Sequence, residues 1–409
     1  MQCRFCKTEL VQVFIDLVSS PASNSFLTRE QLNEPETFYP LKVFTCHNCF
    51  LVQVDEYKKS NAIFDSNYAY FSSYSSSWLK HASDYVDKMT AKYGYTEDCL
   101  VMEIASNDGY LLQYFLQKGI RVMGVEPTAN TAEVAIGKGI KTIIEFFGVD
   151  LADRLANHWD VKADLLLGNN VLAHVPDIMD FVAGMKIILK QNGVITMEFP
   201  HLMQLVDNSQ FDTIYHEHFS YLSFHTVQQI FESQGLVLFD VEEIPTHGGS
   251  LRIYARHGED NSKPVAESVA RLLQKEKDRG MTSLSYYQHF QQKAFEVKLG
   301  LTEFLLQQKR AGKKVAAYGA AAKGNTLLNY CGIKNDLIDF VVDANPHKQD
   351  KFLPASHIPV VTEERLKEFR PDFVLILPWN LKEEISGQLS YIHEWGGRFV
   401  IAVPQFEIL

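Results

Sequence analysis

The chain alternates between short apolar runs and longer amphipathic stretches over most of its central part. Amphipathic stretches with helical spacing lie at residues 78–93, 111–118 and 131–138. Short apolar runs, which are typical of buried strands, lie at residues 100–104, 122–126, 163–167 and 193–198. Short strands separated by helices predict a parallel sheet that is covered by helices.

A second alternation follows and indicates another α/β unit. After Thr226 a helical stretch leads to apolar runs at 236–240 and 251–254, which we expect to complete the first sheet. The pattern is then helical from residue 263 to about 310, with a break near Gly280 and with Pro264 in a first helical turn. Strand-like runs resume at 315–319, 338–343, 373–377 and 398–403. The last part of the chain is therefore predicted to be a second, smaller α/β unit.

Four cysteines near the start stand as two C-x-x-C pairs, Cys3 with Cys6 and Cys46 with Cys49. This spacing is typical of a tetrahedral zinc site made of thiolates. Four thiolates complete the shell of a zinc ion and leave no open position, so the zinc is predicted to be structural. The stretch between the pairs holds several prolines and is predicted to be rich in loops. This zinc module is expected to end near residue 65.

Size and charge narrow the possible classes of protein. A chain of 409 residues predicts two or three domains. The net charge of −11 argues against binding to nucleic acid, and we find no apolar run of the roughly 20 residues that a membrane span needs. Thiolates arranged for zinc fit a reducing compartment, so we expect a cytoplasmic protein without a membrane partner. No heptad pattern stands out, which favours a monomer.

Acidic residues follow the first two strands of the predicted central sheet. Glu103, Asp108 and Gly109 belong to the loop after the first strand, and Glu126 ends the second. Such an acid can accept hydrogen bonds from ribose hydroxyls. The loop lacks the G-x-G-x-x-G pattern of a pyrophosphate binder, so a ligand with a ribose and no phosphate fits better. S-adenosylmethionine is such a ligand. An ordinary strand–loop–helix turn is the alternative.

Two imidazoles, a carboxylate and a phenol lie within four consecutive residues, Tyr215, His216, Glu217 and His218. A histidine is a natural general base near neutral pH. In an extended loop, Tyr215 and Glu217 would face one way and the two histidines the other. Structural histidines and a second metal site are the alternatives.

Together these motifs resemble a known family, the S-adenosylmethionine-dependent sugar C-methyltransferases, which act on nucleotide-linked keto-deoxysugars. The resemblance covers essentially the whole chain. The residues that carry it are the two C-x-x-C pairs and the runs 103–109, 124–127, 169–175, 215–218, 318–326 and 342–348.

The resemblance implies an α/β fold with three domains. These are a small zinc-binding N-terminal domain at residues 1–75, a Rossmann-like methyltransferase core at 76–295, and a second, smaller Rossmann-like domain at 296–409 that helps to bind the nucleotide sugar.

The resemblance also implies roles for individual residues. His218 is expected to be the catalytic base, with Tyr215 and Glu217 supporting it. The expected contacts of S-adenosylmethionine are Glu103, Ala105, Ser106, Asn107, Asp108, Gly109, Tyr110, Glu126, Pro127, Asn169 and Asn170. A tyrosine near the sugar is expected from the aromatic run 68–74, and Tyr70 is favoured over Tyr68. This run could equally be core or a domain seam.

The nucleotide sugar is expected to meet several further segments. The loop from Gly319 to Gly324 follows a strand and opens a helix, so its backbone N–H groups and Lys323 suit a diphosphate. Helix–strand packing is the alternative there. Trp379 is a further expected substrate contact, a candidate to meet the nucleotide base, and a packing role is its alternative. The remaining expected substrate contacts are His216, His247, Arg252, Asn325, Asp343, Lys348 and Asn380.

The expected reaction follows from the acidity of a C–H group beside a ketone. His218 would remove the C3 proton of a 4-keto sugar, and the carbanion would take the methyl group of S-adenosylmethionine. Glu217 could orient His218 or hold a neighbouring donor, and Tyr215 could hydrogen-bond the keto oxygen.

Two rival functions stay open. One is a methyltransferase that acts on O or N of another small metabolite. The other is a non-enzymatic zinc-ribbon module on a Rossmann scaffold. The 215–218 cluster argues against the first, and the acidic balance argues against the second.

Overall fold

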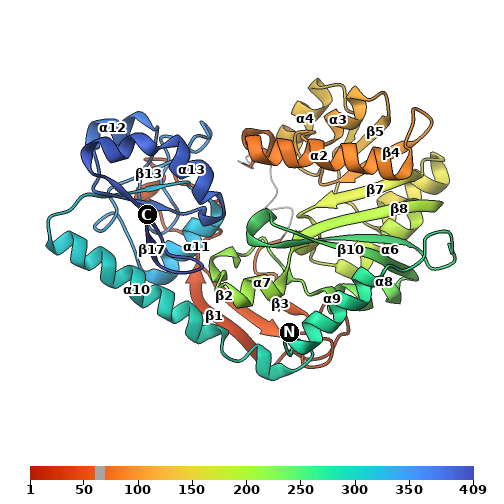
Figure 1. The fold of residues 1–409 in the computed structure, drawn as a ribbon, viewed down its shortest axis with the longest axis horizontal. Helices are drawn as coiled ribbons and strands as arrows, with labels where there is room; N and C mark the ends of the chain where they lie inside the picture. Colours follow the sequence, from red (N-terminus) through yellow and green to blue (C-terminus); the bar gives the residue numbers. More distant parts are fainter. Residues whose placement is uncertain (60–69) are drawn as a thin grey trace.

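The computed structural model describes residues 1–59 and 70–409, and its frame consists of three sheets. Figure 1 shows the central sheet on the right, the C-terminal sheet on the left, and the N-terminal strands below and between them. The α/β class with three parts is thus confirmed. Among the described residues, no helix is both long and apolar enough to cross a membrane.

The central sheet has seven strands in the order β10-β11-β8-β7-β4-β5-β6. Only β11 runs antiparallel to its neighbours. The strand order reverses between β4 and β7, and ligands bind at the carboxyl ends of strands beside such a switch point. The strands are β4 (Leu100–Ile104), β5 (Arg121–Val125), β6 (Thr142–Ile143), β7 (Ala163–Asn169), β8 (Leu189–Pro200), β10 (Leu236–Ile244) and β11 (Ser250–His257).

Helices cover both faces of this sheet (Figure 1). Ser75 caps the N-terminus of α2, the first of them, because its hydroxyl accepts the Trp78 backbone N–H. Gly94, in the left-handed region, caps the C-terminus. The helices in this part of the chain are α2 (Ser76–Tyr93), α3 (Leu112–Gln117), α4 (Ala129–Gly137), α5 (Val149–Asp153), α6 (Ile178–Ile188), α7 (Leu202–Asp207), α8 (Phe224–Ser233) and α9 (Glu267–Asp278). Among them, α7 packs with the N-terminal strands instead of the central sheet. Pro264 precedes α9 by three residues, so the prediction that it lies in a first helical turn is wrong.

The C-terminal sheet has six strands in the order β14-β13-β12-β15-β16-β17, parallel except for the last pair. Its strands are β12 (Val315–Tyr318), β13 (Val341–Val342), β14 (Val360–Val361), β15 (Phe373–Ile376), β16 (Arg398–Ile401) and β17 (Glu407–Ile408). Its helices are α10 (Phe290–Arg310), α11 (Ala322–Cys331), α12 (Glu364–Phe369) and α13 (Lys382–Gln388). The domain limits at residues 75 and 295 stay predictions, and the second of them lies inside α10.

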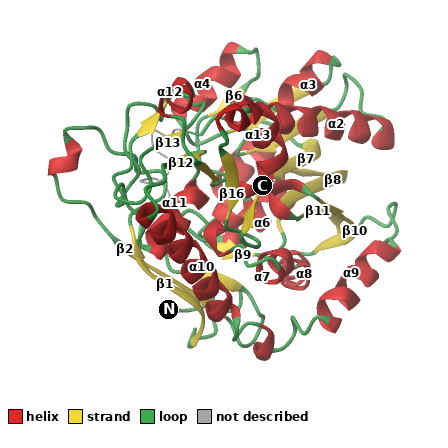
Figure 2. Ribbon diagram, turned by 60° about the vertical axis from the view of Figure 1, so that its left-hand side comes forward, coloured by secondary structure: helices red, strands yellow, loops and turns green. Residues whose placement is uncertain are grey.

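The stretch between the cysteine pairs is more regular than predicted. It contains β1 (Gln12–Ser20) and β2 (Tyr39–Thr45), which pair antiparallel. Two register irregularities break the alternation of β1, and this hides the strand in the sequence. The buried face of β1 packs on α10, where the rings of Phe14 and Phe290 stack 4.7 Å apart. Figure 2 shows α10 running alongside β1.

The N-terminal sheet includes a strand from the central part of the chain. Its order is β1-β2-β3-β9, where β3 is Val52–Val54 and β9 is Ser220–Tyr221. β9 begins two residues after His218. The zinc module therefore shares a sheet with the segment that carries the predicted base.

Candidate active site

A cavity of about 690 Å³ lies where the three parts of the molecule meet. Asn24 of the N-terminal module, residues at the carboxyl ends of the central strands, and Lys323 of the C-terminal unit all line it. Seven of the predicted cofactor contacts also line it, namely Ala105, Asn107, Tyr110, Glu126, Pro127, Asn169 and Asn170. Residues that are distant in the sequence thus converge on one space.

The loop after β4 forms hydrogen bonds with Glu126, which follows β5, and with residues 70–73, the linker before α2. Asn107 has a φ of 48°, and its backbone N–H donates to Glu126 at 2.9 Å. The Asn107 carboxamide accepts the Ser72 N–H at 2.9 Å and donates to the Tyr70 carbonyl at 3.1 Å. Tyr70, predicted near the sugar, lines the cavity, whereas Tyr68 lies outside the described residues.

Four predicted cofactor residues lie behind the cavity wall. They are Glu103, Ser106, Asp108 and Gly109. The Asp108 carboxylate accepts the Ser73 N–H at 3.1 Å and so anchors the linker. Burial raises the pKa of Glu103 well above its ordinary value, since it disfavours the charged form. Gly109 has a φ of 75°, and a Cβ there would lie 2.4 Å from Ile140 Cδ1.

The wall beside β7 is suited to a polar ligand. The side-chain nitrogen of Asn169 and the side-chain oxygen of Asn170 are buried without a hydrogen-bond partner among the described residues. A buried polar atom without a partner costs free energy unless a ligand or water satisfies it. This side of the cavity therefore fits a ligand such as S-adenosylmethionine, with Glu126 placed to accept hydroxyl groups.

Two aromatic residues that follow β6 were not predicted as part of the site. Phe146 and Phe147 line the cavity beside Glu145. They come shortly after β6, the edge strand beside β5, and β6 has only two residues. A strand of two residues shows no hydrophobic periodicity in the sequence. The position of the loop after β6 could therefore be found only from the folded sheet.

His218 has one defined tautomer. Its Nδ1 lies 2.8 Å from the Thr213 carbonyl oxygen, which can only accept, so Nδ1 carries the proton. This leaves Nε2 with a lone pair, and His218 lines the cavity. Its ring lies 4.0 Å from the ring of Tyr215 and 4.6 Å from that of His174. Burial lowers the pKa of His218 well below its ordinary value, and His174, His247 and Lys323 act in the same direction.

Residues 215–218 form a turn, so the predicted alternation of side chains does not occur. The His218 N–H donates to the Tyr215 carbonyl at 3.0 Å. As a result Tyr215, Glu217 and His218 all line the cavity. His216 turns away, with Nε2 3.2 Å from the Pro40 carbonyl oxygen of β2, which gives no support to its predicted contact with substrate.

Glu217 is held by the N-terminal module. The Asn24 amide nitrogen donates to both of its carboxylate oxygens, at 2.8 and 3.0 Å. Burial raises the pKa of Glu217 to about 7, although Asn24, Lys58 and Lys348 oppose this shift. The group that orients His218 is the Thr213 carbonyl, so Glu217 serves another purpose.

The C-terminal unit contributes two lysines to the cavity, Lys323 and Lys348. Lys323 Nζ donates to Asn380 Oδ1 at 2.7 Å and lies 4.6 Å from the centre of the Trp379 ring. Burial lowers the pKa of Lys323. Lys348 Nζ donates to the Ala320 carbonyl at 2.8 Å. These lysines are the groups in this unit best placed to meet an anionic ligand.

Several predicted substrate contacts support the wall instead. Trp379 donates through Nε1 to the buried Asp212 at 2.7 Å, which agrees with the packing alternative. Asp343 accepts the Ala320 N–H at 2.8 Å, and Asn325 donates to the Ser23 carbonyl at 2.6 Å. Gly319, with a φ of 89°, packs against Pro378.

Arg252 does not line the cavity, whereas His247 does. Arg252 is buried and donates to Glu198 at 2.9 Å, and Glu198 also lies 2.9 Å from His81 Nε2. Although burial favours the neutral form, His81 and Arg252 together lower the pKa of Glu198. His247 lines the cavity with Nε2 2.8 Å from Asn170 Nδ2, and burial lowers its pKa to about 4.

The four predicted metal ligands form a compact cluster. The sulfur atoms of Cys3, Cys6, Cys46 and Cys49 all lie within 4.8 Å of one another, and three pairs are 3.5 Å apart. Tetrahedral zinc with Zn–S bonds of about 2.3 Å would separate its sulfurs by about 3.8 Å, so the cluster fits the ion. Four thiolates leave no open position for chemistry.

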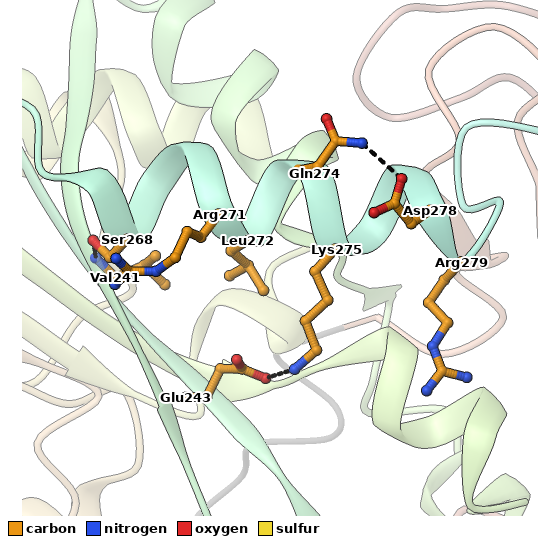
Figure 3. Close-up of a pocket in the computed structure, with 9 residues that line it drawn as sticks. All are labelled: Val241, Glu243, Ser268, Arg271, Leu272, Gln274, Lys275, Asp278 and Arg279. Atoms are coloured by element: carbon orange, nitrogen blue, oxygen red, sulfur yellow. Dashed lines mark hydrogen bonds and ion pairs between the residues drawn. The ribbon is translucent and has the colours of Figure 1, made fainter.

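A further hollow lies between α9 and β10, and none of the predicted site residues lines it (Figure 3). Charged and polar side chains that line it pair with each other. Lys275 binds Glu243 at 2.6 Å, and Gln274 binds Asp278 at 2.6 Å. This hollow offers no chemistry beyond a solvated surface.

Three family models match successive parts of the chain. They are described as "Putative zinc binding domain" at residues 3–64, "Methyltransferase domain" at residues 80–241, and "C-methyltransferase C-terminal domain" at residues 245–404.

Comparison with single proteins gives a relative over the full length. The C-methyltransferase NovU of Streptomyces niveus is 34% identical over 408 residues, which cover 100% of this chain and 96% of that protein. Among solved structures, an S-adenosylmethionine-dependent methyltransferase of Clostridium acetobutylicum is 11% identical with a TM-score of 0.35, covering 44% of this chain and 92% of its own. Magnesium protoporphyrin IX methyltransferase of Synechocystis is 14% identical with a TM-score of 0.33, covering 43% and 78%.

The order of the three family models and the full-length relative agree with the cysteine cluster and with the switch-point cavity. The chain therefore belongs to the S-adenosylmethionine-dependent C-methyltransferases that combine a zinc-binding N-terminal domain, a methyltransferase core and a C-methyltransferase C-terminal domain.

Proposed function

We propose that the enzyme methylates C3 of a nucleotide-linked 4-keto-6-deoxysugar. The observation that carries this proposal is the position of His218. Nε2 of His218 carries no proton. His218 lines the same cavity as the predicted contacts of the methyl donor and as Lys323 and Lys348. One base can therefore serve a methyl donor and an anionic acceptor that approach from different domains.

S-adenosylmethionine, when bound, supplies an electrophilic methyl group on a sulfonium. The residues that would hold it are Glu126, Asn169, Asn170 and the aromatic pair Phe146 and Phe147. Glu126 already accepts the backbone N–H groups of residues 107 and 128, both at 2.9 Å, so its carboxylate is fixed before any ligand arrives.

His218 acts on the acceptor as a general base. A C–H bond beside a ketone is acidic because the carbanion delocalises onto oxygen. A low pKa keeps His218 neutral at physiological pH, so Nε2 can take the C3 proton. The imidazolium that forms keeps its Nδ1–H bond to the Thr213 carbonyl. The electron pair left on C3 would form the new bond to the methyl carbon as the sulfur–methyl bond breaks and its electron pair returns to sulfur. The proton would stay on His218 until solvent removes it.

Tyr215 is placed to act on the oxygen of the ketone. Its ring lies 4.0 Å from the His218 ring, and both residues line the cavity. Burial raises the pKa of Tyr215 well above its ordinary value, so the phenol stays protonated and can donate a hydrogen bond. Such a donor stabilises the enolate oxygen that develops as C3 loses its proton.

Lys323 and Lys348 support the choice of a nucleotide-linked acceptor. Both ammonium groups come from the C-terminal unit and line the same cavity as the predicted donor contacts. Each donates one short hydrogen bond to the protein, and Lys348 also lies 3.7 Å from a carboxylate oxygen of Asp343. An ammonium group has three donors, so both lysines keep capacity for a ligand. A diphosphate is an anion of the size and charge that such a pair can hold.

The test is incubation of the enzyme with S-adenosylmethionine and a panel of dTDP- and GDP-linked 4-keto-6-deoxysugars. Mass spectrometry should find a gain of one methylene in one acceptor, and NMR should place the new methyl on C3. A methyl on oxygen or nitrogen would overturn the proposal in favour of another methyltransferase activity. Conversion of none of these sugars would overturn the assigned acceptor class.

A further inference from the structure

The N-terminal module contributes a side chain to the cavity itself. Asn24 follows β1 in the chain, and it lines the cavity together with Glu217. Both of the Glu217 oxygens accept from the Asn24 amide nitrogen, at 2.8 and 3.0 Å. No pattern in the sequence links these residues, which are 193 positions apart.

The segment that carries Asn24 is fixed from the other side. Residues 20–23 are buried. Asn325 of α11 donates to the Ser23 carbonyl at 2.6 Å, and Asn329 donates to the Ser20 hydroxyl at 3.2 Å. Asn24 is thus held between α11 and the 215–218 turn. This restricts movement of its amide away from Glu217.

We propose that Asn24 is a positioning residue of the acceptor site, which keeps the Glu217 carboxylate ionised and directed at the acceptor. This inference rests on the proposed function for the identity of the acceptor only. An amide N–H donates to a carboxylate and therefore favours its charged form. A carboxylate fixed by one donor group keeps lone pairs for a second. Glu217 can therefore accept a hydrogen bond from a hydroxyl or amino group of the sugar.

Other charged and titratable groups also act on Glu217. Lys58 and Lys348 favour its ionised form, and the buried Tyr215 is its titratable neighbour in the turn. Asn24 is the group among these that contacts both oxygens directly. Its removal should therefore change the titration of Glu217 while the two lysines remain.

The first readout needs no substrate. In protein labelled with ¹³C-glutamate, the Glu217→Gln variant assigns the Glu217 carboxyl resonance. The titration midpoint of that resonance should move to higher pH in Asn24→Ala, because the carboxylate loses its donor. Asn329→Ala removes a tie of the same segment without touching Glu217 and should leave the midpoint unchanged. An unchanged midpoint in Asn24→Ala would overturn the proposal.

The second readout uses the acceptor that the sugar panel identifies. Asn24→Ala should raise the KM for this acceptor by about tenfold to a hundredfold, the usual cost of losing a hydrogen bond to a charged group. The dissociation constant of S-adenosylmethionine should stay within about twofold, since Glu217 lies on the acceptor side. Equal losses for donor and acceptor would mean a merely structural role and would overturn the proposal.

A second variant covers the case in which Asn24→Ala is unstable. Asn24→Asp keeps the shape of the side chain but sets a carboxylate against Glu217, so the upper titration step of the pair should rise further. If no panel sugar is converted by the wild type, the acceptor assignment fails, while the glutamate titration still decides the role of Asn24.

Discussion

The Thr213 carbonyl determines which nitrogen of His218 can act as a base. It accepts from Nδ1 and leaves Nε2 free to take a proton. His218→Asn removes this base and keeps a polar side chain of similar size. We expect methyl transfer to fall by about 10²-fold to 10⁴-fold, the range that a general base contributes. Binding of S-adenosylmethionine, measured by calorimetry, should stay close to that of the wild type.

His216 provides the matched control for this variant. It is two residues away, equally an imidazole, and bonded to the Pro40 carbonyl outside the cavity. His216→Asn should lower the thermal unfolding midpoint and leave most of the turnover per folded molecule. Turnover that survives in His218→Asn but not in His216→Asn would exchange the roles of the two residues.

The pH dependence of activity should report Glu217. Burial raises its pKa to about 7, so its ionised form is lost as the pH falls through about 7. His218 has a pKa far below this and stays neutral over the same interval. We expect kcat/KM for the acceptor to fall on the acidic side with a midpoint near 7. In Glu217→Gln this limb should vanish, and a limb that persists there would assign it to another group.

Residue types were easier to predict than the directions of their side chains. The 215–218 cluster was recognised because a base, a phenol and a carboxylate stand together in the sequence. The side on which each lies depends on the His218 to Tyr215 turn bond, which no local pattern indicates. Asn24 and Thr213 were missed since their partners become neighbours only in the folded chain.

Among the elements, the loop between β4 and α3 has no room for a side chain at Gly109. Gly109 has a φ of 75°, and a Cβ would lie 2.4 Å from Ile140 Cδ1. Gly109→Ala should cost about 1–2 kcal/mol for the left-handed backbone and about 1–3 kcal/mol for the overpacked contact. Urea unfolding should show this loss, and binding of S-adenosylmethionine should weaken because the loop lies directly at the cavity.

A matched substitution at Gly94 measures the backbone cost alone, without the cost of an overpacked contact. Gly94 ends α2 with a φ of 66°, and nothing lies within 4 Å of a Cβ placed there. Gly94→Ala should therefore show only the backbone cost of about 1–2 kcal/mol and normal ligand binding. If both variants lose the same free energy of unfolding, the contact with Ile140 contributes nothing.

Long apolar strands were predicted well, and short or irregular ones were not. The runs that became β4, β5, β7 and β8 needed no tertiary information, because buried parallel strands are uniformly apolar. β6 has two residues, and β1 contains irregular register, so neither shows a clear period. The missed β6 also hid Phe146 and Phe147, since loops in this fold are located by the strands that precede them.

At the scale of the whole molecule, the zinc module supports the turn of residues 215–218, which carries the proposed base. Arg4 lies between the first two cysteines, and its guanidinium donates to the Pro176 carbonyl at 3.1 Å and to the Phe219 carbonyl at 3.2 Å. Phe219 directly follows His218, and Pro176 comes two residues after His174. β3 of the module also pairs with β9. The module thereby contacts the segments that carry His174 and His218, two of the histidines that line the cavity.

Loss of zinc should therefore damage the acceptor chemistry before the donor site. In Cys6→Ser, or after removal of the metal with a chelator, the cysteine cluster loses the ion that holds Arg4 in place. We expect a lower thermal unfolding midpoint and a decrease of at least about tenfold in kcat for methyl transfer, since small displacements of a catalytic group have effects of this order. Affinity for S-adenosylmethionine should change less, because its predicted contacts lie on the central sheet.

Cys99 is the matched control, because it is also partly buried and lies outside the cluster. Cys99→Ser should keep one zinc per chain, the wild-type unfolding midpoint and full turnover. Metal content, calorimetric unfolding and turnover measured on the same samples separate the two cases. A zinc-free protein with normal turnover would show that the contacts of Arg4 and the pairing of β3 with β9 hold the 215–218 turn without the metal. A parallel loss of donor binding and turnover would instead mean that the ion stabilises the fold as a whole.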